Sequence, residues 1–182
     1  MKRIARLTLS MLVLASIASA QVPGTIAVFG DEANSDCYII DAPGLVHAYV
    51  FHLGSDGTLA SQFMLQLNGG ASLIHVTDIF KVGLQLGTTV TGVAFSYQAC
   101  LASPIYLADV LWTGTGTSPA CSTIDVVADP VAITGTIEVV DCALVKHIGA
   151  GGSVVVNGNP VDCRCDRAIE ETTWGKLKSL YE

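Results

Sequence analysis

The spacing of turn signals is the feature that most constrains the fold. Clusters of Gly, Pro, Asn and Asp recur at short intervals from residue 30 to residue 160. These residues supply the backbone conformations that turns require. The runs between the clusters are short and rich in Val, Ile, Thr, Phe and Tyr, which favour strands. The sequence therefore predicts many short strands.

Several of these runs alternate in the way a half-buried strand does. Residues 45–53 and 60–67 each place alternate side chains on opposite faces. Residues 105–113 and 137–144 are more continuously apolar, as central strands are. Strands at this spacing predict an all-β fold: a single Greek-key, immunoglobulin-like β-sandwich of about nine to ten strands. No helical period occurs in residues 21–165, which disfavours a nucleotide-binding βαβ fold.

The first 20 residues predict a secretory signal peptide. They start with basic residues, contain an apolar core and end in Ala-Ser-Ala at 18–20, a small-residue cleavage site. No later run approaches the roughly 20 apolar residues of a membrane helix. The chain thus divides into a signal peptide at 1–20, a β-sandwich domain at 21–165 and a C-terminal tail at 166–182. We expect the protein to be secreted or held at the cell envelope.

Charge disfavours two classes of partner. The chain has nine Lys and Arg residues against sixteen Asp and Glu residues. Three of the basic residues and none of the acidic ones lie in the signal peptide, so residues 21–182 carry a net charge of −10. Nucleic acids and anionic membrane surfaces both need clustered Lys and Arg. Neither is therefore expected as a partner.

All the cysteines follow the signal peptide, and an even count in an exported chain indicates disulfides. A bond between Cys163 and Cys165 would close a very tight ring and is disfavoured. A zinc site is a weaker alternative, because only this one close pair exists. The six cysteines are Cys37, Cys100, Cys121, Cys142, Cys163 and Cys165.

Two disulfide pairings compete. Cys37 and Cys100 are favoured first, because one lies at the start of an expected strand and the other at the end of one. Cys121 and Cys142 are the rival pair, because a hairpin that turns near Val131 would place them opposite each other. Accepting both pairs leaves Cys163 and Cys165 only each other, so the conflict stays open.

Candidate catalytic groups are few. His47 and His52 lie on one expected strand but on opposite faces, so they cannot act together. His47 and His75 would meet if their strands paired, with Asp78 or Asp109 nearby as a partner for metal binding or acid–base chemistry. His147 is the fourth histidine, and a structural role is favoured for all four.

Two carboxylates, Asp109 and Asp141, lie in strongly apolar strands. Burial would raise their pKa values, and a pair of such acids could hydrolyse glycosides. A structural role, in which each accepts hydrogen bonds from backbone N–H groups, is favoured over catalysis. No Gly-x-Ser-x-Gly, His-Glu-x-x-His or phosphate-loop motif occurs.

A loop at 30–36 is the best ion candidate. Asp31, Glu32, Asn34 and Asp36 offer several oxygen donors close together, which calcium favours. The loop lacks the spacing of an EF-hand, so no cofactor is expected, with calcium as the one possible exception. Aromatic residues in strands are expected mostly in the core, and any that face outward in a row could stack on sugars. They are Tyr38, Tyr49, Tyr97, Tyr106 and Trp112.

The tail differs from the rest of the chain. Thr172 or Thr173 could cap a short helix of about ten residues, which is marginal alone in water. The helix would form by packing on the sandwich or on a partner; otherwise the tail stays frayed. Its apolar stripe, at helical spacing, consists of Trp174, Leu177, Leu180 and Tyr181.

Several stretches, taken together, resemble a group of uncharacterised secreted bacterial proteins that end in a Thr-Thr-Trp-Gly-x-(Ile/Leu/Val)-Lys-x-Leu-Tyr tail. This resemblance implies an exported, cysteine-bridged β protein whose tail is a shared sorting or docking element, and it carries over no catalytic residue. The stretches are Gly30 to Ala33 with Cys37, Gly92 to Tyr97 with Cys100, Val126 to Pro130, Val139 to Cys142, Cys163-x-Cys165 and residues 172–181.

These observations favour a non-catalytic structural or binding module that acts outside the cell or at its envelope, with an unknown glycan or protein partner. Two alternatives remain. The first is an extracellular hydrolase of polysaccharide or peptide that uses Asp109, Asp141 or a histidine. The second is a calcium-dependent carbohydrate-binding module.

Overall fold

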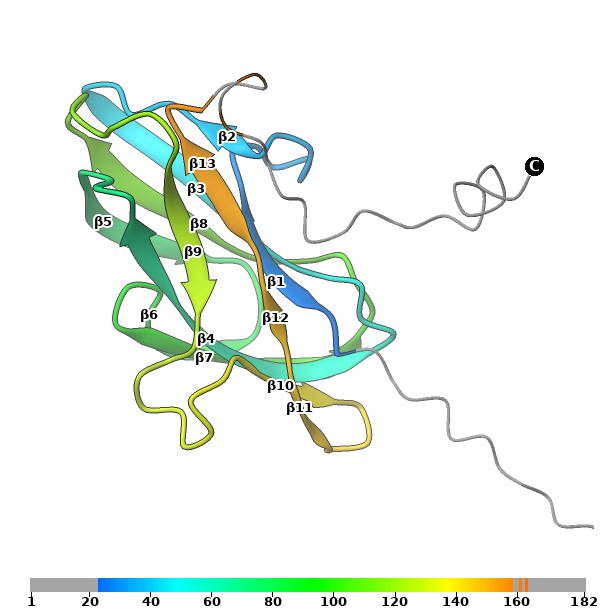
Figure 1. The fold of residues 1–182 in the computed structure, drawn as a ribbon. Coiled ribbons are helices and arrows are strands. Elements are labelled where there is room, and N and C mark those ends of the chain that lie inside the picture. The colour runs from blue at the N-terminus through cyan, green and yellow to red at the C-terminus, as the bar shows by residue number, and fades with distance from the viewer. Residues whose placement is uncertain (1–22, 159–160, 162, 164–182) are drawn as a thin grey trace, which may run out of the picture.

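The structure is a computed structural model that describes residues 23–158, 161 and 163. Its described part contains strands and no helix, and the strands form two sheets that pack face to face (Figure 1). The strands are β1 (Thr25–Phe29), β2 (Tyr38–Ile39), β3 (Gly44–Leu53), β4 (Thr58–Asn68), β5 (Leu73–Phe80), β6 (Leu84–Thr88), β7 (Gly92–Leu101), β8 (Ile105–Gly114), β9 (Ser122–Val127), β10 (Glu138–Asp141), β11 (Lys146–Ile148), β12 (Ala150–Gly151) and β13 (Ser153–Val156).

The prediction of an all-β, two-sheet fold is confirmed, but the structure has 13 strands where nine to ten were expected. The additional strands include β6, β11 and β12, which have two to five residues each. The expected signal peptide and tail helix, with Cys165, lie outside the described residues. Within the described residues, no helix is long and apolar enough to cross a membrane.

One sheet has five strands in the order β12-β1-β3-β8-β5. The other has eight: β11-β10-β4-β9-β13-β2, with β7 paired to β4 and β6 to β7. Side chains of alternate residues meet between the sheets, as expected from the period of a strand. Val46, Ala48 and Val50 of β3 and Trp112 of β8 are buried there. They face Phe63, whose ring stacks on that of Phe95 with centroids 5.8 Å apart.

β9 and β10 lie end to end along the same edge of β4. Val127 of β9 is opposite Met64, and Glu138 of β10 is opposite Gln62. The other edge of β4 is taken by β7 and by the carbonyl of Thr89, which accepts the N–H of Leu65. The ten residues 128–137 are therefore an excursion from one continuous line of pairing, and no hairpin joins β9 to β10.

The glycine-rich segment Gly-Ala-Gly-Gly at 149–152 carries the chain from one sheet to the other. β12 pairs with β1 of the five-stranded sheet, and the next strand, β13, pairs with β9 of the larger sheet. The N–H of Gly152 donates to Ile26 in one sheet, and its carbonyl accepts the N–H of Val126 in the other. This crossover joins the two sheets through the backbone itself.

The disulfides differ from both predicted pairings. The bonds are Cys100–Cys142 and Cys121–Cys163, with Cα–Cα distances of 5.5 and 5.4 Å. Cys37 is also disulfide-bonded. The pairs Cys37–Cys100 and Cys121–Cys142 were therefore wrong, whereas the expectation that Cys163 would not bond to Cys165 agrees with the Cys121–Cys163 bond.

Strand order gives the reason for these pairings. Cys121 and Cys142 lie at opposite ends of the line formed by β9 and β10, because no hairpin turns between them. Cys100 lies near the end of β7, and Cys142 comes directly after β10. Both strands end beside the start of β4, where Leu101 and Asp141 are both opposite Thr58. This disulfide links the two strands that flank β4.

The carboxylate of Asp41 gives the fold a predicted dependence on pH. Burial alone would raise the pKa of Asp41, but hydrogen bonds from the N–H groups of Gly116 and Ser118, at 2.9 and 2.8 Å, outweigh it and lower the pKa to about 2. Because the folded pKa is below the unfolded one, about 2 kcal/mol of stability is present above about pH 4 and is lost as the pH falls toward about 2.

Asp41→Asn should therefore flatten the dependence of the unfolding free energy on pH across that acid range. It should also lower the unfolding free energy at neutral pH by about 2 kcal/mol. Urea unfolding at a series of pH values measures both effects. Asp56→Asn, at an exposed turn position, is the control; an equal effect there would contradict the role given to Asp41.

Candidate functional site

The outer face of the five-stranded sheet carries a row of aromatic side chains. Val46, Ala48 and Val50 of β3 point into the core, so the alternate residues point outward. His47, Tyr49 and Phe51 are the central outward residues of β3. The neighbouring strand β8 adds Tyr106 and Asp109, which are opposite Phe51 and Tyr49 in the register. We call these five residues the aromatic face.

The rings of the aromatic face contact one another in sequence. His47 stacks on Tyr49 with centroids 5.9 Å apart, and Phe51 stacks on Tyr106 at 4.8 Å. Tyr49 and Tyr106 join the two pairs at 6.3 Å. The ammonium group of Lys81 lies 5.4 Å from the centre of the Tyr106 ring, within the range of a cation–π contact. His47 is exposed, Tyr49 and Tyr106 are partly exposed, and Phe51 is buried.

Both tyrosines of this face remain neutral at physiological pH. Burial, followed by the charge of Asp109, raises the pKa of Tyr49 and that of Tyr106. The 30–36 loop follows Phe29, which is opposite Tyr49 in the register, and the charge of Glu32 in this loop also raises both pKa values. The Tyr106 hydroxyl is buried and has no hydrogen-bond partner among the described residues. Neutral phenols with raised pKa values bind through their rings and O–H groups rather than act as bases.

His47 and Asp109 form the polar part of the aromatic face. Nδ1 of His47 lies 3.0 and 3.1 Å from the two carboxylate oxygens of Asp109. The His47 side chain is 42% exposed, whereas that of Asp109 is only 10% exposed. Asp109 therefore holds the imidazole ring in place while the ring stays open to a ligand.

The loop proposed for calcium uses its acids to shape the turn. One carboxylate oxygen of Asp31 accepts the N–H groups of Ser35 and Asp36 at 2.8 and 3.1 Å, and the other accepts the Ser35 hydroxyl. Asp36 accepts the N–H of Tyr38. Among the described residues, no group of three or more His, Cys, Asp or Glu side chains is placed to hold a metal ion. Calcium binding at Asp31, Glu32, Asn34 and Asp36 stays a prediction.

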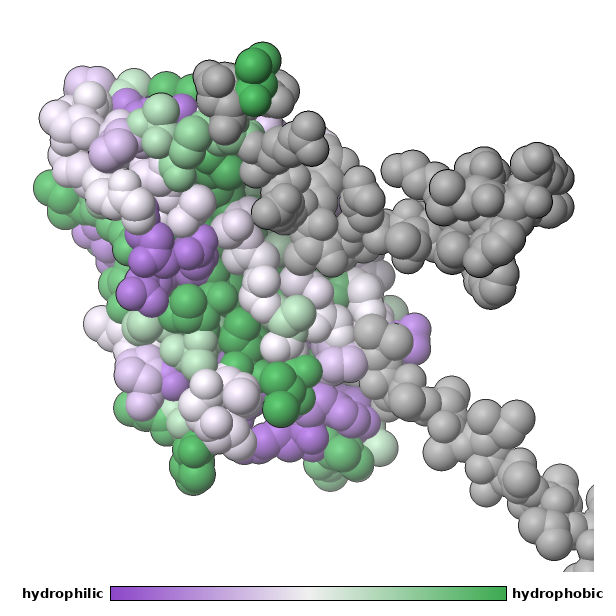
Figure 2. Space-filling view, in the orientation of Figure 1, coloured by the Kyte–Doolittle hydropathy of each residue, from purple (hydrophilic) through white to green (hydrophobic). Residues whose placement is uncertain are grey.

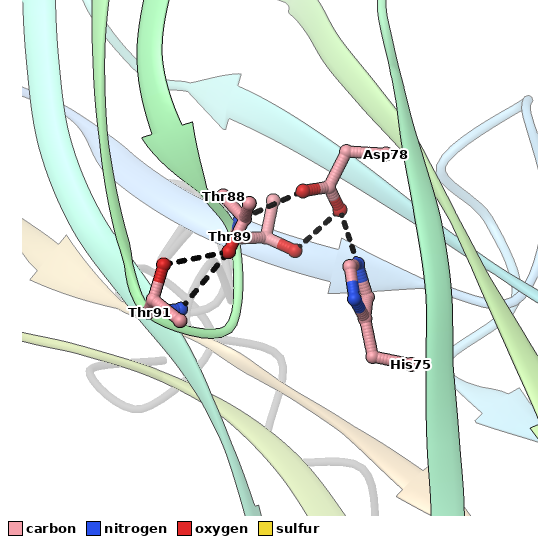
Figure 3. Close-up of polar contacts among 5 residues, drawn as sticks. All are labelled: His75, Asp78, Thr88, Thr89 and Thr91. Carbon is pink, nitrogen blue, oxygen red and sulfur yellow. Dashed lines mark hydrogen bonds and ion pairs between the residues drawn. The ribbon is translucent and has the colours of Figure 1, made fainter.

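The expected meeting of His47 and His75 does not occur, because β8 lies between β3 and β5. His75 points to the inner side of its strand, where its Nε2 is 3.0 Å from Asp78. Asp78 also accepts the N–H and the hydroxyl of Thr89 at 2.8 and 2.6 Å (Figure 3). Because Thr89 is fully buried, this cluster ties β5 to the turn after β6 and offers no accessible nucleophile.

The remaining histidines also have structural partners. His52 is fully buried, and its Nε2 lies 2.8 Å from the carbonyl of Pro23. Burial lowers the pKa of His52, so the ring stays neutral. His147 lies 2.7 Å from Asp141, which also accepts two N–H groups of its own turn. Hydrogen bonds, first that of His147, lower the pKa of Asp141, contrary to the rise expected from burial.

The two acids weighed for hydrolysis lie apart in the fold. Asp109 belongs to β8 of the five-stranded sheet and Asp141 to β10 of the other sheet. Each is bonded to a different histidine. They do not form the facing pair that glycoside hydrolysis requires.

Sequence reasoning identified most members of the aromatic face singly but did not join them. Leu45, His47, Tyr49 and Phe51 were expected to share one face of a strand, and they do. Phe51 and Lys81 were not singled out as functional residues. The signal available was that both faces of β3 are apolar, which a strand with one solvated face does not show.

No protein-family model matches the chain, and no curated protein sequence matches it. Solved structures resemble its fold at a distance. One is the sixth cohesin of scaffoldin B from Acetivibrio cellulolyticus, solved in complex with a dockerin, with 12% identity, a TM-score of 0.49 and coverage of 75% of this chain and 99% of that one. Another is a cohesin module of a family 33 glycoside hydrolase from Clostridium perfringens, with 13% identity, a TM-score of 0.46 and coverage of 75% and 98%.

Proposed function

We propose that this protein is a secreted, non-catalytic binding module that takes its ligand on the aromatic face. The observation that carries the proposal is the row of touching rings held against the carboxylate of Asp109 on an outer sheet surface. Flat rings provide apolar contact, and the adjacent imidazole and carboxylate provide hydrogen bonds that orient a ligand. We retain the Greek-key, immunoglobulin-like class for the sandwich that presents this face.

A glycan is the ligand class to test first, because sugars offer both an apolar ring face and hydroxyl groups. The disulfides support a location outside the cytoplasm, since such bonds persist in oxidising compartments. The proposed cleaved signal peptide would deliver the chain there. A protein partner on the same face is the other outcome of the test.

The experiment is native electrophoresis through gels that contain soluble polysaccharides, one polysaccharide to a gel. We expect the native protein to be retarded by at least one of them. His47→Ala and Tyr49→Ala should each weaken the affinity at least fivefold, or about 1 kcal/mol. Thr123→Ala, at a half-buried position on the outer side of the other sheet, is the matched control and should leave retardation unchanged.

Three results would count against the proposal. Equal retardation of all variants would remove the aromatic face as the site. Release of reducing sugar from a retarding polysaccharide would favour the hydrolase alternative. The calcium-dependent module would be favoured if chelator lowered both the gel retardation and the melting temperature and if added calcium restored them.

A further inference from the structure

Exposed aliphatic side chains gather on two neighbouring segments, away from the aromatic face. The first is the excursion 128–137 between β9 and β10, and the second is the turn and strand 142–148 after β10. They form the two lowest projections of the described domain in Figure 1, and Figure 2 shows hydrophobic colour at the lowest point of each, with hydrophilic surface between them. The exposed residues are Val131 at 75%, Ile133 at 99%, Leu144 at 78%, Val145 at 51% and Ile148 at 68%.

The first segment is fixed in place by Asp129. Its carboxylate accepts the N–H of Val131 at 2.8 Å and the side-chain amide of Gln62 at 2.9 Å. Its carbonyl accepts the N–H of Ala132 at 2.9 Å. Because Asp129 is itself buried against β4, the apolar tip is presented by an ordered turn.

The second segment is held in the same way by Asp141. One oxygen of its carboxylate accepts the N–H groups of Ala143 and Val145, both at 2.8 Å. Leu144 between them has a φ of 64°, in the left-handed region that favours glycine and asparagine. A leucine held there, mostly exposed on a braced turn, indicates a use for its side chain.

The two segments are linked and lack exposed acid groups. Glu138 accepts the hydroxyl of Thr134 from the first segment and the ammonium group of Lys146 from the second, both at 2.7 Å. The three carboxylates within residues 128–148, those of Asp129, Glu138 and Asp141, are all buried. An acidic protein thus keeps negative charge away from the surface of these tips.

We propose that the two tips insert into the surface of a lipid bilayer, a role beyond the ligand binding proposed above. Convex aliphatic tips suit the boundary between headgroups and acyl chains. Protein-docking surfaces are instead enriched in Trp, Tyr and Arg, and residues 128–148 contain none of these. Because residues 21–182 carry a net charge of −10, apolar burial rather than charge drives the association. The bilayer is therefore neutral, with zwitterionic headgroups.

The test is sedimentation of the purified protein with phosphatidylcholine vesicles. The native protein should sediment with them equally at low and high salt. Ile133→Asn with Leu144→Asn should lower the partition coefficient at least about tenfold. Asparagine suits the left-handed turn, so the melting temperature should not fall.

The matched control is Leu84→Asn with Leu86→Asn, since these two leucines of β6 are 59% and 71% exposed outside the tips. This pair should sediment like the native protein. A second readout does not depend on loss of function: the fluorescence of Ile133→Trp should shift to shorter wavelength when vesicles are added.

Several outcomes would overturn the proposal. They are no sedimentation of the native protein, an equal loss in the β6 control, or no fluorescence shift. Sedimentation that needs anionic lipid and vanishes in salt would also overturn it. A native dimer that the tip variants convert to monomer would assign the tips to contact between copies. Loss of glycan retardation in the tip variants is not expected, so failure here and failure of the proposed function can be told apart.

Discussion

Replacing both Cys121 and Cys163 with serine should lower the free energy of unfolding by about 4 kcal/mol. The bond spans 42 residues, and in the chain-entropy account its stabilisation comes from the unfolded states that it forbids. A domain of this size is stable by roughly 5–15 kcal/mol, so the loss is a large fraction of the total. Guanidinium unfolding of the native and doubly substituted chains measures it.

The second disulfide provides a matched comparison, because Cys100–Cys142 also spans 42 residues. Serine at both of its positions should cost the same amount if loop entropy dominates. Unequal losses would assign the difference to contacts in the folded state. Losses below about 1 kcal/mol for both pairs would contradict the entropic account.

Gly151→Ala should be the most damaging single substitution at the crossover between the sheets. A Cβ at Gly151 would lie 2.2 Å from the carbonyl oxygen of Val126 and 2.8 Å from Cδ1 of Ile137. The first contact is with backbone that is paired within the crossover, so it cannot yield without loss of pairing. We expect destabilisation of about 3 kcal/mol, measured by thermal and denaturant unfolding.

Gly54→Asn is the control for this substitution. Gly54 has a positive φ of 66°, and nothing lies within 4 Å of a Cβ built on it. Asparagine tolerates that conformation, so stability should change little. If Gly151→Ala proved as mild as the control, the crossover would have to be looser than its contacts indicate.

The sequence predicted the class of fold because its strand signals are local. Phe63 and Leu65 alternate along their strand with residues that include Gln62 and Gln66. The face that carries the two apolar side chains could therefore be assigned to the core. β12 could not be found in this way. Its residues, Ala150 and Gly151, have no strand preference, and they pair only because the chain crosses between the sheets there.

The disulfides could not be predicted because they depend on which strands are neighbours. The hairpin assumed between Cys121 and Cys142 is reasonable for two strands separated by a turn signal. In the structure β9 and β10 instead lie end to end along one edge of β4. This arrangement has no signature in the local sequence. Pairing of distant segments, not local pattern, decided the bonds.

The aromatic face was only partly predictable for a related reason. Alternation showed that His47 and Tyr49 share a face of their strand, but both faces of β3 are apolar and the core side could not be chosen. Joining them to Tyr106 and Asp109 required the register between β3 and β8. The sequence could therefore supply the residues of the candidate site but not their arrangement.

The crossover also determines when this chain can finish folding. β1, near the beginning of the chain, borders β12 at residues 150–151, and β2 borders β13 at residues 155–156. β2 therefore waits for its partner until more than a hundred residues later, and β1, which also pairs with the nearby β3, waits as long for its second neighbour. Such non-local pairing is slow. A chain that emerges from its N-terminal end cannot close its sandwich until nearly all of it has been released.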